Sequence, residues 1–164
     1  MKKIGIVMGS DSDMPVAEKA INTLSEYGVP FEVHVYSAHR TPEEAIAFAK
    51  EARQNGFAAI IALAGKAAHL GGVLAANTTL PVIGVPVKSS LDGIDALLST
   101  VQMPPGIPVA SVGIDAAANA ALLAIEMLAI TDENLANILT AKRQEAKEKV
   151  LEKNRNIEEK FNRR

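Results

Sequence analysis

Tyr36-Ser37-Ala38-His39-Arg40-Thr41-Pro42-Glu43-Glu44 is the stretch where an alternating strand pattern gives way to a helix pattern. Residues 31–36 alternate apolar and polar side chains, as in a strand. Thr41 is a favourable helix N-cap, Pro42 suits the first helical position, and Glu44 is placed to close a capping box with Thr41. The pattern therefore predicts that His39 and Arg40 lie at the carboxyl end of a strand, beside a helix N-terminus.

The same strand-to-helix unit recurs along the chain and predicts an α/β fold with a parallel sheet. Its expected order, 2-1-3-4-5, is the usual one for five strands. The strands are expected at 4–8, 31–36, 58–64, 82–87 and 109–114, and the helices at about 14–27, 41–55, 91–101 and 116–130. We expect residues 1–130 to form the main domain. Residues 131–164 are predicted to form a long charged helix with a thin apolar stripe, which packs on a neighbouring subunit.

Three segments rich in chemically active or small residues follow the first three strands: Gly9–Asp13, Ser37–Arg40 and Gly65–Gly72. In the expected strand order these segments are neighbours along the carboxyl edge of the sheet, where ligands bind in such folds. A histidine that can carry a proton and an arginine that can clamp an anion would then share one site.

The segment Gly9-Ser10-Asp11-Ser12-Asp13 offers hydroxyls and backbone N–H groups at a helix start, which suits a phosphate or a sugar. The alternative is that Asp13 is a plain helix cap and Ser10 a turn residue. Asp11 and Asp13 lack an apparent third ligand for magnesium.

The segment 65–72 has few large side chains, so its backbone can approach a flat ligand closely. The alternative is tight strand-helix packing with His69 as a structural hydrogen bonder. His34 is expected to face outward, and no two of the three histidines have metal-ligand spacing, which argues against a zinc site.

Composition narrows the class of protein. The 164 residues include no cysteine, so disulfides and thiolate chemistry are excluded. The start of the chain lacks the apolar region of a signal peptide and no segment suits a membrane span, so we expect a cytoplasmic protein. Residues 141–164 hold nine Lys and Arg against five Glu. These charges alternate in sign, which favours a solvated helix over nucleic-acid binding.

Several segments together resemble the N5-carboxyaminoimidazole ribonucleotide mutases of bacterial purine biosynthesis. The similarity covers roughly residues 3–130, and the combination is highly specific although no single segment is. The segments are Met8-Gly9-Ser10-Asp11-Ser12-Asp13, Ser37-Ala38-His39-Arg40-Thr41-Pro42, Ala64-Gly65-Lys66-Ala67-Ala68-His69-Leu70, Pro81-Val82-Ile83-Gly84-Val85-Pro86-Val87 and Val101-Gln102-Met103-Pro104.

The resemblance implies a flavodoxin-like three-layer fold, a homo-octamer, a small-molecule ribonucleotide substrate, and no cofactor or metal. It implies that Ser10, Ser37 and Arg40 lie near the phosphate, that Asp13 binds the ribose hydroxyls, and that His39 carries the proton. The remaining implied substrate-binding residues, around the aminoimidazole and its carboxylate, are Gly65, Lys66, Ala67, Ala68, His69 and Leu70.

This chain departs from the family pattern at Lys66 and Gly71, where Gly and Pro are more usual. Related aminoimidazole ribonucleotide carboxylases, which use carbon dioxide directly, tend to carry an Arg at the position of Lys66. Direct carboxylation is therefore the alternative reaction. A phospho-accepting receiver domain is excluded because the third strand ends Ala64-Gly65 without an Asp. A flavin carrier is disfavoured because the chain has no Trp and only two Tyr to flank the ring.

Overall fold

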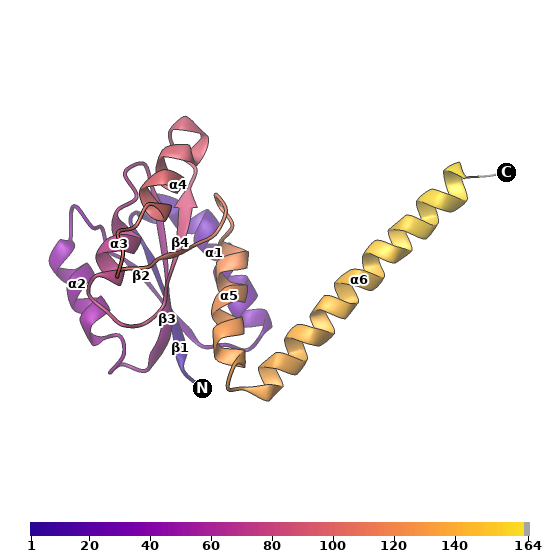
Figure 1. Cartoon of the computed structure of the whole chain (residues 1–164), viewed down its shortest axis with the longest axis horizontal. Coiled ribbons are helices and arrows are strands. Elements are labelled where there is room, and N and C mark those ends of the chain that lie inside the picture. Colours follow the sequence, from indigo (N-terminus) through magenta and orange to yellow (C-terminus); the bar gives the residue numbers. More distant parts are fainter. Residues whose placement is uncertain (163–164) are drawn as a thin grey trace.

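A computed structural model describes residues 1–162 and shows a three-layer α/β/α arrangement (Figure 1). The sheet is parallel with the order β2-β1-β3-β4-β5, as the sequence predicts. Its strands are β1 (Lys3–Met8), β2 (Phe31–Val35), β3 (Phe57–Gly65), β4 (Val82–Val87) and β5 (Ala110–Ser111).

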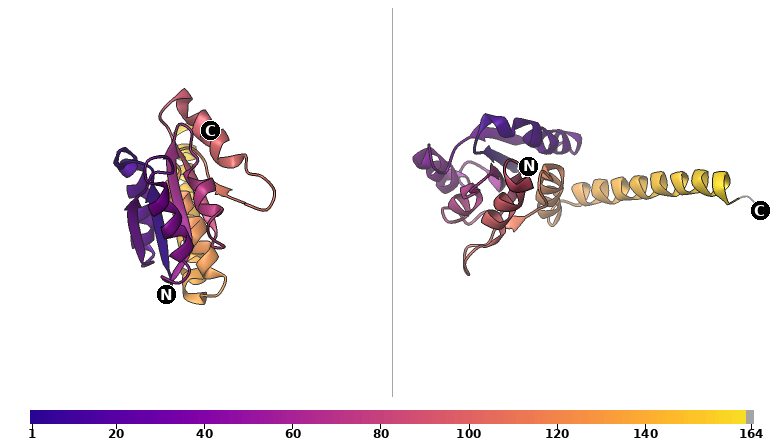
Figure 2. Two further views of the ribbon diagram at one scale, coloured as in Figure 1. Left: turned by 90° about the vertical axis from the view of Figure 1, so that its left-hand side faces the viewer. Right: turned by 90° about the horizontal axis from the view of Figure 1, so that it is seen from above.

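Helices cover both faces of the sheet (Figures 1 and 2). One face packs against α1 (Met14–Glu26) and α5 (Ala117–Ala129). The other packs against α2 (Pro42–Glu51) and α3 (Leu70–Ala75), while α4 (Ile94–Val101) packs on β4. Short 3₁₀ turns at Asp11–Asp13 and Leu91–Gly93 lead into α1 and α4.

The central strands are apolar because helices bury them on both faces. Ile4, Ile6, Ile61 and Leu63 are fully buried in one core cluster. Met8 at the end of β1 lies opposite both Val35 of β2 and Leu63 of β3. β1 and β2 therefore end at the same level and β3 ends two residues farther on, which brings the loops that follow them together.

The fifth strand is much shorter than the predicted 109–114. Only Ala110 and Ser111 pair with β4, opposite Ile83 and Gly84. Gly84 and Pro86 both face β5, because their carbonyls accept from Val112 N at 3.1 Å and from Asp115 N at 2.9 Å. Pro86 has no N–H to donate in return, so the ladder ends there.

The predicted helix at 91–101 is also divided. Asp92 and Gly93 adopt left-handed φ angles of 55° and 88°, which separate the 3₁₀ turn from α4. A left-handed φ breaks the helical hydrogen-bond pattern, and the apolar periodicity of this segment did not reveal it.

His34 does not face outward as expected. Its ring stacks on Tyr36 with centroids 5.3 Å apart and lies 4.9 Å from the ring of Phe48 on α2. The outer strand β2 is thus covered by α2 on the face that carries the more polar side chains. This histidine is therefore part of the packing between β2 and α2.

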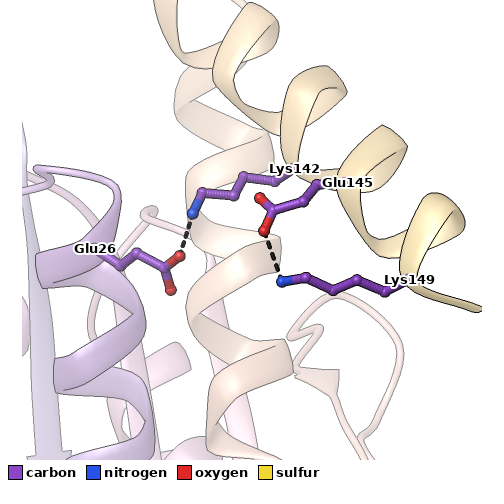
Figure 3. Close-up of polar contacts among 4 residues, drawn as sticks. All are labelled: Glu26, Lys142, Glu145 and Lys149. Atoms are coloured by element: carbon purple, nitrogen blue, oxygen red, sulfur yellow. Dashed lines mark hydrogen bonds and ion pairs between the residues drawn. The ribbon is translucent and has the colours of Figure 1, made fainter. Parts of the chain in front are cut away.

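The last helix is α6 (Glu133–Phe161), and Asp132 is its N-cap. The side chain of Asp132 accepts from Leu135 N at 3.1 Å, and Leu135 and Leu139 are buried against the main domain. Two ion pairs then join α6 to that domain, Lys142 with Glu26 (Figure 3) and Arg143 with Glu126.

Beyond Arg143, α6 projects away from the rest of the chain (Figures 1 and 2). Residues 143–161 are all exposed, including the apolar side chains of Val150, Leu151, Ile157 and Phe161. Within residues 1–162, no helix has both the length and the apolar character that a membrane crossing requires.

Candidate functional site

The three loops that follow β1, β2 and β3 meet around one cleft of about 540 Å³, as predicted from the strand order. Small, hydroxyl-bearing, charged and imidazole side chains line this cleft. The lining residues are Gly9, Ser10, Ser12, Asp13, Ser37, Ala38, His39, Arg40, Ala64, Gly65, Lys66, Ala67, His69, Leu70 and Ser89.

Ser37 organises the turn that carries His39 and Arg40. Its hydroxyl oxygen accepts from His39 N at 3.3 Å and from Arg40 N at 3.2 Å. Its backbone N–H donates to Thr41 Oγ1 at 2.8 Å, and its carbonyl accepts from Thr41 N at 3.0 Å. The turn is therefore closed by several local bonds, which fix the direction of the two functional side chains.

The predicted capping box between Thr41 and Glu44 is wrong. Thr41 is the N-cap residue of α2, but its side chain caps no helical N–H. Its hydroxyl is already used by the N–H of Ser37. A side chain that closes the preceding turn cannot also satisfy the first turn of the helix.

Arg40 joins two of the loops. Its Nη2 donates to the carbonyl of Gly9 at 2.9 Å, while its Nε lies 3.5 Å from Ser37 Oγ. The guanidinium is thus held beside the segment Gly9–Asp13 and keeps further N–H groups for an anion.

His39 and His69 come into direct contact across the cleft. Nε2 of His39 lies 2.8 Å from Nδ1 of His69, and the two rings meet nearly edge to face at 85°. A hydrogen bond between two ring nitrogens needs one nitrogen with a proton and one without. The pair can therefore hold a single proton between the rings and is suited to proton transfer.

Asp13 is a buried carboxylic acid at the wall of the cleft, with 9% of its surface exposed. Burial raises the pKa of this carboxyl above the ordinary aspartate value, and the nearby Asp11 and Asp115 raise it further. Hydrogen bonds from Ser10 and Ser12 oppose the rise. Ser10 also caps the 3₁₀ turn, because its hydroxyl accepts from Ser12 N at 3.3 Å.

The loop after β3 lies close to Ser89, the residue that the sequence interpretation missed. Lys66 N donates to Ser89 Oγ at 3.2 Å, and a Cβ added to Gly65 would lie 2.9 Å from the same oxygen. Ser89 follows β4, the next strand along the same edge, so the rule that selected the first three loops applies equally to it.

Ala68 is the predicted substrate-binding residue that does not line the cleft. It is 1% exposed and lies beneath the loop surface. Across residues 1–162, no three His, Asp or Glu side chains are grouped so that they would hold a metal ion.

Comparison with known proteins agrees with this geometry. The family model described as AIR carboxylase matches residues 3–149. The chain belongs to the AIR carboxylase family. The family's match spans the main domain and the first part of α6, and thus every residue that lines the cleft.

Individual members of the AIR carboxylase family are similar over nearly the whole chain. An N5-carboxyaminoimidazole ribonucleotide mutase from Methanocaldococcus jannaschii is 56% identical and covers 96% of this chain and 99% of its own. A protein of the same name from Pyrococcus horikoshii is 54% identical, covering 95% and 89%. The crystal structure of Treponema denticola PurE has a TM-score of 0.86 at 30% identity and covers 98% of each chain.

Proposed function

We propose that this chain is an N5-carboxyaminoimidazole ribonucleotide mutase, an isomerase that moves a carboxylate from N5 to C4 of the aminoimidazole ring in purine biosynthesis. The observation that carries the proposal is the contact between His39 and His69 in a cleft that also holds an arginine and a buried aspartate. Relatives matched over nearly their whole length carry the mutase name, which favours this reaction over direct carboxylation.

The nucleotide is proposed to bind with its phosphate near Arg40. The guanidinium and the hydroxyls of Ser10 and Ser12 lie on the same side of the cleft, where hydrogen-bond donors suit a phosphate. Asp13 lies in the same loop and is proposed to accept from the ribose hydroxyls. This arrangement directs the ring toward the two imidazoles.

The reaction needs no net proton. Cleavage of the bond between N5 and the carboxyl carbon releases carbon dioxide and leaves the nitrogen to take a proton, which we assign to His39. The electron-rich C4 then attacks the carbon dioxide, and the new carbon–carbon bond leaves a hydrogen on C4. Its removal as a proton restores His39 and the aromatic ring, so one imidazole acts first as acid and then as base.

The protein contributes position more than reactivity. Carbon dioxide is a small apolar molecule, and the walls near the imidazoles are lined by Ala38, Ala64, Gly65 and Ala67. These residues offer no polar side chain that would hold water or capture the gas. Retention of carbon dioxide beside C4 makes the second step effectively unimolecular.

The test is to supply N5-carboxyaminoimidazole ribonucleotide without ATP and to follow the C4-carboxylated product by ultraviolet absorbance. The proposal expects rapid conversion by the wild-type protein. A parallel assay with aminoimidazole ribonucleotide and bicarbonate separates the two reactions. Efficient product formation from that mixture at low carbon dioxide, with slow conversion of the N5-carboxylated substrate, would make the protein a carboxylase.

A homo-octamer is proposed as the working form, with residues 131–164 packed on a neighbouring subunit. The exposed apolar side chains of α6 support this proposal, because nothing within residues 1–162 buries them. The cytoplasmic location stays a prediction of the sequence.

A further inference from the structure

We infer that Lys66 is a specificity residue whose ammonium group recognises the carboxylate that is transferred, and so distinguishes carboxylated from decarboxylated nucleotide. The inference rests on the proposed function and adds a residue role to it. It begins from a backbone observation. Lys66 has φ of 55°, in the left-handed region that a residue with a Cβ rarely adopts.

The surrounding loop maintains this unusual conformation. The N–H of Lys66 donates to Ser89 Oγ at 3.2 Å, which ties the residue to the end of β4. Strain of this kind costs about 1 kcal/mol and persists where the surroundings impose it, often at binding sites. A glycine would adopt the same φ without strain, so a lysine at this position lowers stability relative to a glycine.

The permanent positive charges of the cleft come from two different loops. Among its lining residues, Arg40 and Lys66 carry the permanent positive charges. Arg40 is held against the carbonyl of Gly9, on the side proposed for the phosphate. Lys66 belongs instead to the loop after β3, which carries His69 and lines the same cleft.

The proposed substrate and product also carry two anionic groups, a phosphate and a carboxylate. The carboxylate is attached to the ring that must reach His39. Lys66 is the permanently charged residue of the loop 65–70. The other side chains of this loop are those of Ala67, Ala68, His69 and Leu70. Within residues 1–162 no ion pair uses this ammonium group, which leaves it available for the carboxylate.

The kinetic consequence follows from when the negative charge is present. Substrate and product both carry the carboxylate, whereas the carbon dioxide between them is neutral. A cation at this place therefore stabilises the bound ground states more than the transition state, and its removal raises KM without lowering kcat.

The experiment compares Lys66→Met with Lys66→Arg by calorimetric titration in carbon-dioxide-free buffer. The two ligands are the C4-carboxylated ribonucleotide and the decarboxylated aminoimidazole ribonucleotide. Lys66→Met is expected to weaken binding of the carboxylated ligand about fivefold, as for an exposed ion pair, and to leave the other unchanged. Lys66→Arg is expected to retain the preference, and the difference between ligands should decrease with added salt.

Equal weakening of both ligands by Lys66→Met, or no weakening of either, would overturn the assignment. Lys66→Gly provides a folding control, because it removes the charge together with the backbone strain. It is expected to melt no lower than wild type while showing the same loss of preference as Lys66→Met. Wild-type turnover of the N5-carboxylated substrate is read separately and tests the proposed function itself.

Discussion

The imidazole of His39 depends on its neighbours for position and on His69 for its hydrogen bond. The hydroxyl of Ser37 accepts from the backbone N–H of His39 and fixes the turn. The 2.8 Å contact with His69 fixes the ring. The contact with His69 is not local enough for sequence patterns to reveal, because His69 is thirty residues away. The sequence indicates that the two loops meet, but not that these two nitrogens face each other.

Replacement of His39 by Asn should separate binding from turnover. Asn retains hydrogen bonding but cannot carry a proton at neutral pH, so kcat is expected to fall by at least about 100-fold. Calorimetry with the C4-carboxylated ribonucleotide should still detect binding. His34→Asn is the matched control, because His34 packs against Tyr36 and Phe48 away from the cleft. Normal turnover by the His39 variant would remove this residue from the mechanism.

The buried carboxyl of Asp13 is expected to lower the stability of the protein when it is ionised, although it is proposed to bind the ribose. Its pKa is raised above the ordinary aspartate value of 3.8, chiefly by burial, so the ionised form destabilises the folded protein. The folded state binds this proton more tightly than the unfolded state. The free energy of unfolding therefore decreases as pH rises from about 3.8 through the raised pKa of Asp13.

Asp13→Asn is accordingly expected to melt about 2 °C or more above wild type at pH 7 and to bind the nucleotide more weakly. The advantage in melting temperature should shrink as the pH of the measurement approaches 3.8. Glu18→Gln is the control, because Glu18 is an exposed acid on α1, and this variant should melt as wild type does. A lower melting temperature for Asp13→Asn at pH 7 would contradict the argument.

At the scale of elements, the contact between β4 and α4 depends on the absence of a side chain at Gly84. A Cβ built there would lie 2.4 Å from Thr100 Cγ2 and 3.0 Å from Val109 Cγ1. Thr100 has little freedom to move away, because it is buried and its hydroxyl donates to Ala96 O at 2.7 Å.

Gly84→Ala is therefore expected to lower the free energy of unfolding by about 1–3 kcal/mol, measured by urea denaturation. Gly71→Ala is the control on α3, where an added Cβ meets nothing closer than Val109 Cγ1 at 3.6 Å. That variant should be neutral or slightly stabilising, because alanine favours a helix over glycine. Equal stabilities for the two variants would show that α4 moves freely on the sheet.

The sequence predicts the elements best where one physical signal dominates. Strand β4 was expected at 82–87 and is found there, because its apolar run is bounded by turn residues. Strand β5 was overestimated because Pro86, the residue that limits its pairing, lies on another strand. Thr41 is predicted to cap a helix with its side chain, but its hydroxyl serves a different turn.

The sequence likewise predicts some features of the candidate site and misses others. Topology alone predicts that the loops at 9–13, 37–40 and 65–72 meet, and they do. Ser89 was missed because the loop after β4 was not considered with them. The buried position of Ala68 and the left-handed backbone of Lys66 depend on packing, which no local pattern describes.

For the whole molecule, the least explained feature of a single chain is the exposed length of α6. Helical geometry places Ala146, Val150 and Ile157 on the side of the helix that already buries Leu139. One apolar stripe therefore continues from the part that contacts its own domain to the part that contacts nothing. This continuity supports a neighbouring subunit as the second contact.

The double variant Val150→Asp with Ile157→Asp should reduce assembly, because it places two charges on that stripe. Sedimentation is expected to show smaller species than wild type at micromolar concentration. Arg155→Asp is the control, because this residue lies on the opposite side of the helix, and it should assemble as wild type does. A monomeric wild-type protein at that concentration would exclude the proposed packing.

The reach of α6 also determines when its outer turns form. Most of the stability of a helix in a protein comes from packing of its apolar face, and the turns beyond Arg143 gain little of this from their own domain. Their backbone amides should therefore exchange with deuterium rapidly in dilute protein and slowly in concentrated protein, while those near Leu135 stay protected at both concentrations. The exchange rate of these outer turns would then report the concentration of the protein.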